Sequence, residues 1–178
     1  MSDERDLNIV ITGINGEYIS KVAKFLADQF DMYFLDAEAL YEFDIQPFTL
    51  SYVLRKYGVD YYREKQMDTM KYVASFSNTV ISVESGALLY QNNIDTLNKD
   101  GLIIYVRQPV DKVYKALEKR EYLSKEMYSF HGINKREITE RDEILCNVAE
   151  IIVEDLDGAE ISCCNKVIGE IKKYYGVS

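Results

Sequence analysis

Short apolar runs alternate along the chain with longer stretches in which apolar residues recur every three or four positions. Five of these runs are short and mostly apolar, which is typical of strands buried on both faces of a sheet. They are residues 8–12, 32–36, 79–83, 102–106 and 150–155. Strands that alternate with helices predict an α/β fold, in which helices cover both faces of a parallel sheet.

The stretches between and after these runs have the spacing of amphipathic helices. They lie at residues 20–30, in most of 37–75, from 110 to 117, at 140–148 and from Ser162 onward. We expect Ser162 to cap the N-terminus of the last helix. The same helix is expected to turn four side chains toward the core: Val167, Ile168, Ile171 and Tyr175.

The size and composition of the chain predict one folded domain. Its 178 residues are enough for a full core, and a hydrophobic fraction of 47% excludes a disordered chain. Two prolines and nine glycines leave little room for long linkers. We therefore expect a polar N-terminal tail at residues 1–7 and a single domain at 8–178. Residues 120–138 are polar and aromatic and contain one glycine, and we expect a lid there.

The charge and the apolar pattern exclude several classes of partner. A net charge of −9 argues against nucleic acid, because phosphate backbones need clustered Lys and Arg side chains. No run of about 18 apolar residues is present to span a membrane, and the acidic start is unlike a signal peptide. Three cysteines and one histidine, with no CxxC pattern, indicate neither a disulfide framework nor a metal site. These features predict a cytoplasmic protein.

The segment after the first strand has the shape of a phosphate-binding loop that leads into a helix. It reads "GINGEYIS" at residues 13–20, and ligands of open parallel sheets bind beyond the carboxyl ends of the strands. In such a loop glycines let backbone N–H groups converge on phosphates, the helix N-terminus adds positive potential, and a lysine neutralises charge. Gly13, Gly16 and Ser20 are therefore candidate nucleotide-binding residues, with the Ser20 hydroxyl placed to hold Mg²⁺.

Three neighbouring positions of this loop act against ATP. Ile19 stands where the loop needs its lysine and cannot compensate phosphate charge. Tyr18 replaces the last loop glycine, so a positive φ there would be strained by about 1–2 kcal/mol. Glu17 adds a carboxylate near a polyanion. Lys21 points about 200° away from Ile19 on a helix, so it would need a re-formed loop to replace the lysine.

Four further segments follow the loop in a recognisable order. They are "LDAE" (35–38), "YYREK" (61–65), "ISVESGA" (81–87) and "ERDEILCNVAEIIV" (140–153). Together with the loop, they resemble the shikimate kinase family, within the small P-loop metabolite kinases, over nearly the whole chain from Asn8. The resemblance implies a three-layer α-β-α fold with a five-stranded parallel sheet of order 2-3-1-4-5. It also implies a monomer and, for an active member, the use of ATP and Mg²⁺.

The resemblance assigns catalytic roles to two residues. Asp36, at the end of the second strand, corresponds to the family's acid that orients Mg²⁺, next to Ser20. Arg120 corresponds to a lid arginine that closes over the phosphates. A purely structural role for Ser20, as a hydroxyl in the first turn of a helix, stays open.

Four substrate-binding roles also follow from the resemblance. Glu38 corresponds to an acid that contacts substrate hydroxyls, and Arg63 to the arginine that grips the substrate carboxylate. Gly86 lies in the turn where substrate approaches the backbone, and Arg141 begins the late helix. Glu84 adds bulk and negative charge to that turn, which suits an anionic substrate poorly. Arg63 has the alternative of pairing with an acid on its own helix.

Two hypotheses about function follow. In the first, the chain is a shikimate kinase-like protein with a degenerate loop that lacks efficient ATP-dependent phosphoryl transfer. It then serves as a ligand-binding or protein-interaction scaffold without a cofactor, for a small acidic metabolite or a protein. In the second, it is an active kinase that uses ATP and Mg²⁺ to phosphorylate a hydroxyl of a small acidic substrate, or of a different substrate through a rewired loop. The 15 tyrosines fit a protein surface better than a nucleic-acid one, because basic residues are few.

Overall fold

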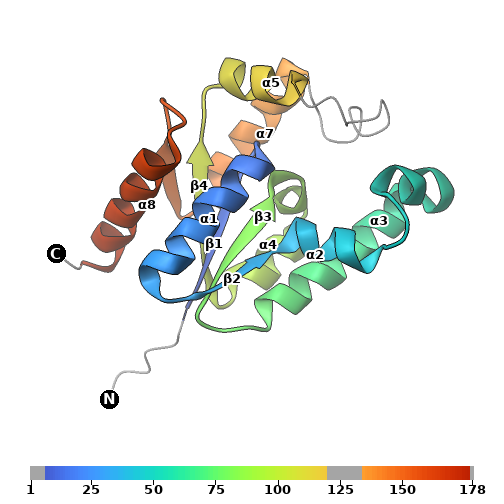
Figure 1. The fold of residues 1–178 in the computed structure, drawn as a ribbon, viewed down its shortest axis with the longest axis horizontal. Helices are drawn as coiled ribbons and strands as arrows, with labels where there is room; N and C mark the ends of the chain where they lie inside the picture. The colour runs from blue at the N-terminus through green and yellow to red at the C-terminus, as the bar shows by residue number, and fades with distance from the viewer. Residues whose placement is uncertain (1–6, 120–133, 177–178) are drawn as a thin grey trace.

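The computed structural model describes residues 7–119 and 134–176 of the chain. In these ranges five strands form one parallel sheet of order β2-β3-β1-β4-β5, which confirms the expected order (Figure 1). The strands are β1 (Asn8–Gly13), β2 (Tyr33–Asp36), β3 (Thr79–Glu84), β4 (Gly101–Arg107) and β5 (Ile151–Glu154). Each strand end lies within one residue of its predicted position, because a continuous apolar run has few other ways to be buried on both faces.

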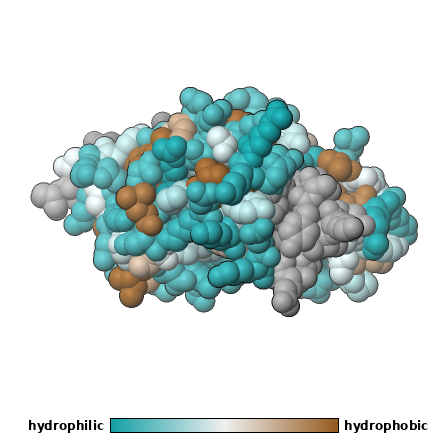
Figure 2. Space-filling view, turned by 90° about the horizontal axis from the view of Figure 1, so that it is seen from above, coloured by the Kyte–Doolittle hydropathy of each residue, from teal (hydrophilic) through white to brown (hydrophobic). Residues whose placement is uncertain are grey.

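Helices cover both faces of the sheet, as expected (Figure 1). They are α1 (Gly16–Phe30), α2 (Ala37–Asp44), α3 (Leu50–Ala74), α4 (Gln91–Asn98), α5 (Val110–Glu118), α7 (Lys135–Val148), α8 (Glu160–Tyr175) and the short 3₁₀-helix η1 (Ser85–Leu89). Successive side chains of a strand point to opposite faces. Ile9 and Ile11 therefore pack with α1 and α8, whereas Val10 packs with α3, α4 and α7. The surface over these layers is mainly hydrophilic on the face seen in Figure 2.

Two predictions for the last helix are wrong. Ala159, not Ser162, is the N-cap of α8, and it makes no side-chain cap bond. Ser162 lies inside the first turn, where its Oγ donates to Asp157 Oδ2 at 3.1 Å. Tyr175 is 46% exposed, because the last turn of α8 extends past the apolar face that it covers. The other three side chains expected to face inward do pack on the core: Val167, Ile168 and Ile171.

The late helix α7 begins five residues earlier than its predicted start at residue 140. Asn134 explains the early start, because its side chain accepts a hydrogen bond from the Glu137 N–H at 2.9 Å and so caps the helix. The lid expected at 120–138 lies mostly outside the described residues, as does Arg120, and its last four residues belong to α7.

The described part of the chain shows no metal cluster and no membrane helix. In residues 7–119 and 134–176, no three Cys, His, Asp or Glu side chains are arranged to hold a metal ion. None of the helices in those ranges is both long enough and apolar enough to cross a bilayer. The cysteines are free thiols, and burial raises the pKa of Cys163 to about 12. Cys163 is therefore protonated at neutral pH and packs as an apolar residue.

Candidate functional site

The carboxyl ends of three neighbouring strands bring the predicted site residues together. Gly13, at the end of β1, is in register with Glu84 at the end of β3. Asp36, at the end of β2, is in register with Ser82 of β3. The helices α1, α2 and η1 begin just beyond these ends. The candidate site therefore lies where ligands of parallel sheets bind.

The turn between β1 and α1 is short. Only two residues separate the strand from the helix. The first helical hydrogen bond runs from the Ile19 N–H to the Asn15 carbonyl at 3.1 Å. Residues 16–19 are therefore helical. Tyr18 is not among the described residues with a positive φ, so the backbone strain expected there is absent.

Ile19, at the position of the loop lysine, is part of the core. Its side chain is 1% exposed and packs with Val22 of α1 against the sheet. A Cβ added to Gly13 would lie 2.6 Å from Ile19 Cδ1, so the isoleucine covers the end of β1 directly. Tyr18 beside it is also buried, and burial raises the pKa of its phenol. Position 19 thus points into the interior of the protein.

Three oxygen-bearing side chains gather beside the first turn of α1. The Ser20 hydroxyl donates a short hydrogen bond to Asp36 Oδ2. Asp36 Oδ1 accepts from the Ala39 N–H at 3.0 Å and so caps α2. The Glu38 carboxylate lies over Gly16, with Oε2 at 3.2 Å from the position that a Cβ would take there. The structure therefore brings Ser20 and Asp36 together, and it places a second carboxylate at the helix N-terminus, where the helix dipole favours negative charge.

Lys21 faces solvent on α1. Its Nζ lies 3.4 Å from Glu17 and 3.7 Å from Glu160, and its side chain is 55% exposed. An exposed ammonium with two carboxylate partners contributes little to stability. In this arrangement Lys21 does not replace the missing loop lysine.

Arg63 of α3 reaches the turn after β3. Its Nη1 donates to Gln66 Oε1 at 2.7 Å and to the Gly86 carbonyl at 3.4 Å. Its guanidinium lies 5.0 Å and 4.6 Å from the ring centres of Tyr62 and Tyr90, within the range of cation–π attraction. Arg63 is therefore held at the turn after β3, and its substrate-binding role stays a prediction.

Arg141 of α7 reaches the same turn from the opposite side. Its Nη1 lies 3.5 Å from the Ser85 hydroxyl oxygen. Burial lowers the pKa of its guanidinium, the Glu84 carboxylate opposes that shift, and Arg63 adds to it. Two arginines from distant parts of the chain thus converge near Glu84, whose charge favours the ionised form of Arg141.

The Glu84 carboxylate lies in the turn after β3, beside Tyr62 and Gly86. Glu84 Oε2 accepts a hydrogen bond from the Tyr62 hydroxyl at 3.3 Å. Its Oε1 lies where a Cβ of Gly86 would be, and Arg141 Nη1 is 3.9 Å from that same position. Burial and the Glu84 charge together raise the pKa of Tyr62, so this tyrosine stays neutral. The cavity that remains beside Glu38 and Glu84 measures about 20 Å³, which is room for roughly one water molecule.

A second charged network was not predicted. Asp142, the residue after Arg141, accepts hydrogen bonds from the Tyr105 hydroxyl at 2.7 Å and from Arg107 Nε at 2.9 Å. Arg107 Nη1 also donates to Glu154 Oε1 at 3.0 Å. The network ties α7 to β4 and β5, and so positions Arg141. Its only signal in the sequence is an arginine at the end of a strand, which does not identify its partners.

The predicted site residues therefore fall into two groups and one remainder. Gly13, Gly16, Ser20, Asp36 and Glu38 lie around the start of α1. The second group lies around the turn after β3: Arg63, Gly86 and Arg141. Arg120 is outside the described residues, so its predicted role stays a prediction.

Comparison with known proteins finds shikimate kinases among both the sequence relatives and the solved structures. A family model described as shikimate kinase matches residues 20–172. A shikimate kinase of Clostridium botulinum (strain Langeland) is 30% identical over 122 residues, which are 65% of this chain and 67% of that protein. One from the strain Eklund 17B is 28% identical over 167 residues, covering 93% and 94% of the two chains. The fold is similar to that of a shikimate kinase from Acinetobacter baumannii solved in complex with shikimate, with a TM-score of 0.81, 22% identity and 94% of each chain covered.

Proposed function

Because the chain belongs to the shikimate kinase family, we propose that it has kept the family fold while losing efficient ATP-dependent phosphoryl transfer. It acts instead as a scaffold that binds a ligand or a protein partner, and it needs no cofactor. The burial of Ile19 carries this proposal, since the side chain at the lysine position is 1% exposed and packs on Gly13. Phosphoryl transfer depends almost entirely on positioning and on charge stabilisation, so the loss of that cation is damaging.

The residues around the start of α1 fit a triphosphate poorly. The Glu38 carboxylate already lies over Gly16, and Glu17 stands in the first turn of the same helix. Both charges repel phosphate at the point where backbone N–H groups would bind it. Ser20 and Asp36 do fit a Mg²⁺ ion, which prefers oxygen ligands. Two side-chain ligands for Mg²⁺ do not form a nucleotide-binding site without backbone N–H groups that bind the phosphates. No catalytic step through ATP is therefore assigned to these residues.

The substrate end of the site supports the same proposal. In the family, the arginine at the position of Arg63 grips the substrate carboxylate, and here Glu84 brings a carboxylate of the protein itself to that region. An acidic substrate would have to displace a group that is covalently attached and always present. The cavity of about 20 Å³ leaves it no space beside Glu84.

Thermal unfolding with and without Mg-ATP tests the proposal. Binding at one hundred times Kd raises the free energy of unfolding by about 2.7 kcal/mol, or the melting temperature by about 5–10 °C for a domain of this size. We expect no rise here, and a clear rise for the Clostridium botulinum relative under the same conditions. A rise for this protein, together with shikimate-dependent release of ADP, would overturn the proposal.

An active kinase is the second candidate function, and one observation favours it. The metal-binding candidates Ser20 and Asp36 are in direct contact, and Arg63 and Arg141 reach the same turn. Such a kinase would use ATP and Mg²⁺ to phosphorylate a hydroxyl of a small acidic substrate, with Arg120 closing over the phosphates. It would require the first turn of α1 to unwind and Glu84 to move aside. Turnover with ATP and any small hydroxy acid would establish it.

Three further parts of the proposal concern the state of the protein. We propose a cytoplasmic monomer that has neither nucleic acid nor a membrane as a partner. The net charge of −9 supports the exclusion of nucleic acid. Light scattering after size-exclusion chromatography tests the monomeric state, and a dimer would refute it.

A further inference from the structure

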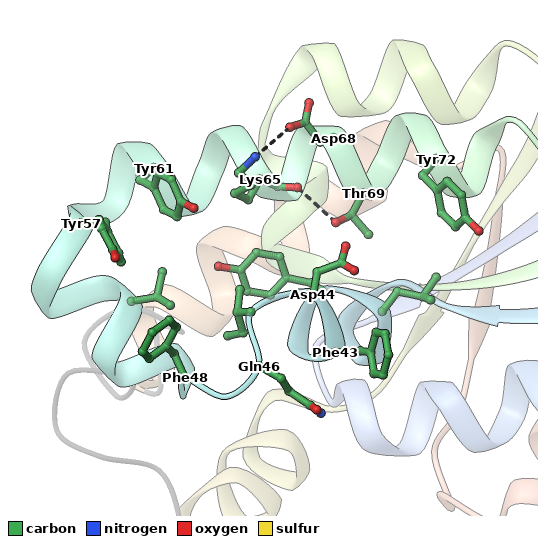
Figure 3. Close-up of a pocket in the computed structure, with 14 residues that line it drawn as sticks. Phe43, Asp44, Gln46, Phe48, Tyr57, Tyr61, Lys65, Asp68, Thr69 and Tyr72 are labelled. Atoms are coloured by element: carbon green, nitrogen blue, oxygen red, sulfur yellow. Dashed lines mark hydrogen bonds and ion pairs between the residues drawn. The ribbon is translucent and has the colours of Figure 1, made fainter.

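A groove beside the candidate site runs between α2 and α3, and Tyr41 and Thr69 line both this groove and the small cavity beside Glu84. Its volume is about 870 Å³, within the range of about 300–1,000 Å³ that is usual for small-molecule pockets. Figure 3 shows Tyr57, Tyr61 and Lys65 on the α3 wall, with Phe43 and Phe48 on the other. The small cavity beside Glu84 is some fortyfold smaller, so the groove is the larger binding space of the two.

Aromatic side chains form much of both walls of this groove. Their exposed fractions lie between 37% and 68%, although rings of this size are usually buried. These residues are Phe43, Phe48, Tyr57, Tyr61 and Tyr72. An array of exposed rings around a concave surface indicates a binding site more than it indicates a fold requirement.

The charges in the groove favour a cation. Two carboxylates line it, Asp44 and Asp68, against one ammonium, that of Lys65. Lys65 Nζ lies 3.6 Å from Asp68 Oδ2 and so balances that charge. Asp44 makes no hydrogen bond or ion pair with the described residues. Among the lining side chains, one negative charge is therefore left over, in a protein whose net charge is −9.

The rings at the edge of the groove already attract ammonium groups. Lys56 Nζ lies 5.2 Å from the ring centres of both Tyr52 and Tyr57, and Lys65 Nζ lies 5.9 Å from that of Tyr61. The ring faces are thus accessible to cations, which the negative face of an aromatic ring attracts.

Tyr41 adds a further ring to the same wall. It lines the groove, is 5% exposed, and its hydroxyl has no hydrogen-bond partner among the described residues. Burial raises the pKa of Tyr41 to about 12, with a smaller contribution from Tyr61, so the hydroxyl is neutral. The hydroxyl oxygen is itself buried, so Tyr41 contributes its ring to the wall of the groove.

We propose that this groove binds a small aryl-alkyl amine in its protonated form. The ammonium pairs with Asp44, and the aromatic part lies among the rings of Tyr57, Tyr61 and Phe48. This inference concerns a different surface from the proposed function and does not depend on it.

A charge series on one carbon skeleton tests the inference. The probes are 3-phenylpropylamine, 3-phenylpropan-1-ol and 3-phenylpropanoate, titrated into the isotopically labelled full chain and followed by NMR at neutral pH. We expect saturable shifts in α2 and α3, with the amine bound about fivefold more tightly than the alcohol and the carboxylate bound most weakly. Equal affinity for amine and alcohol, tighter binding of the carboxylate, or the absence of saturable shifts in α2 and α3 would overturn the inference.

Variants separate the charge of the groove from its rings. Asp44→Asn should remove most of the preference for amine over alcohol, whereas Asp28→Asn, the same change at an exposed position of α1, should leave it intact. Tyr61→Leu should weaken the binding of the amine about threefold to fivefold. Tyr33→Leu, at a tyrosine that is 73% exposed on β2, should leave that binding unchanged. Equal effects within either pair of variants would contradict the assignment of the groove as the site.

Discussion

The two ends of the candidate site differ from the family's pattern in different ways. At the start of α1, Ile19 stands at the position of the loop lysine and is part of the hydrophobic core, and residues 16–19 are helical. At the turn after β3, the arginines are still present, and a glutamate of the protein lies beside them. Under the proposed function, the first end therefore lacks a cation for phosphate although Ser20 and Asp36 are present, whereas the second end has its arginines and a carboxylate beside them.

This difference predicts that ligand binding is harder to restore at the start of α1 than at the turn after β3. A core position is held by packing from several sides, so a polar residue cannot be restored there without loss of stability. A carboxylate at the edge of a turn is held by a few polar contacts, so its removal should leave the arginines in place. The following predictions test that contrast, from the largest expected effect to the smallest.

Ile19→Lys should destabilise the fold by about 3–5 kcal/mol rather than restore nucleotide binding, because it buries an unpaired ammonium. Burial would lower the pKa of this lysine below its unfolded value, so the loss should shrink as the pH rises toward about 10. Urea denaturation at pH 7 and pH 10 measures both effects. Ile19→Val is the matched control, with an expected loss of about 0.5–1.5 kcal/mol. A stable Ile19→Lys protein that binds Mg-ATP would show that this end is reversible after all.

Glu84→Ala should destabilise the fold by about 2 kcal/mol, because Arg141 loses the neighbouring carboxylate that favours its charge. The opened site should then accept a free carboxylate. Shikimate at millimolar concentration should raise the melting temperature of the variant by about 2–4 °C and leave the unmodified protein unchanged. Glu64→Ala, an exposed acid next to Arg63, is the control and should respond as the unmodified protein does. If shikimate does not raise the melting temperature of Glu84→Ala, then the arginines do not bind a free carboxylate even when Glu84 is absent.

Asp142→Asn should destabilise the fold by about 1–2 kcal/mol at pH 7, because Arg107 is partly exposed and its pairing is screened. Burial raises the pKa of Asp142, but hydrogen bonds from Arg107 and Tyr105 lower it by a larger amount, so the net shift of the pKa is downward. A lowered pKa contributes stability above the unfolded value near 4, and this contribution is lost as the pH falls through the folded value. The difference in stability between Asp142→Asn and the unmodified protein should therefore become smaller below about pH 4. Thermal melts from pH 3 to pH 7 measure it, and a constant difference would contradict the role of the charge.

Lys21→Met should change the free energy of unfolding by less than about 0.5 kcal/mol, because both ion pairs of Lys21 are exposed. The response to Mg-ATP should also stay as it is in the unmodified protein. If the unmodified protein binds ATP and Lys21→Met abolishes that binding, then Lys21 serves as the replacement lysine and α1 must re-form around it. Lys24→Met, three residues further along α1, provides the comparison.

The sequence alone was enough to place the strands and their order. The continuous apolar runs of β1, β3 and β4 are buried in the centre of the sheet, while β2 and β5 lie at its edges, and the order 2-3-1-4-5 followed from the resemblance and is confirmed. The sequence also placed Ser20 and Asp36 near the carboxyl ends of strands, because the ends of parallel strands lie at one edge, whereas Arg63 and Arg141 followed only from the resemblance. It could not supply the cap of α8 or the early start of α7, because capping depends on which side chain meets which N–H group.

The direction of individual side chains was decided only by the tertiary structure. The sequence showed that Ile19 lacks a charge, but not that it packs on Gly13 and closes the position. It placed Glu84 in the turn, but the contacts with Tyr62 and the approach of Arg141 join α3 and α7, which are far apart in the chain. The groove between α2 and α3 likewise depends on how two helices pack. Local patterns determine which face of a helix or strand is buried. Long-range packing determines which groups each of the other side chains contacts, and the proposed function depends on those contacts.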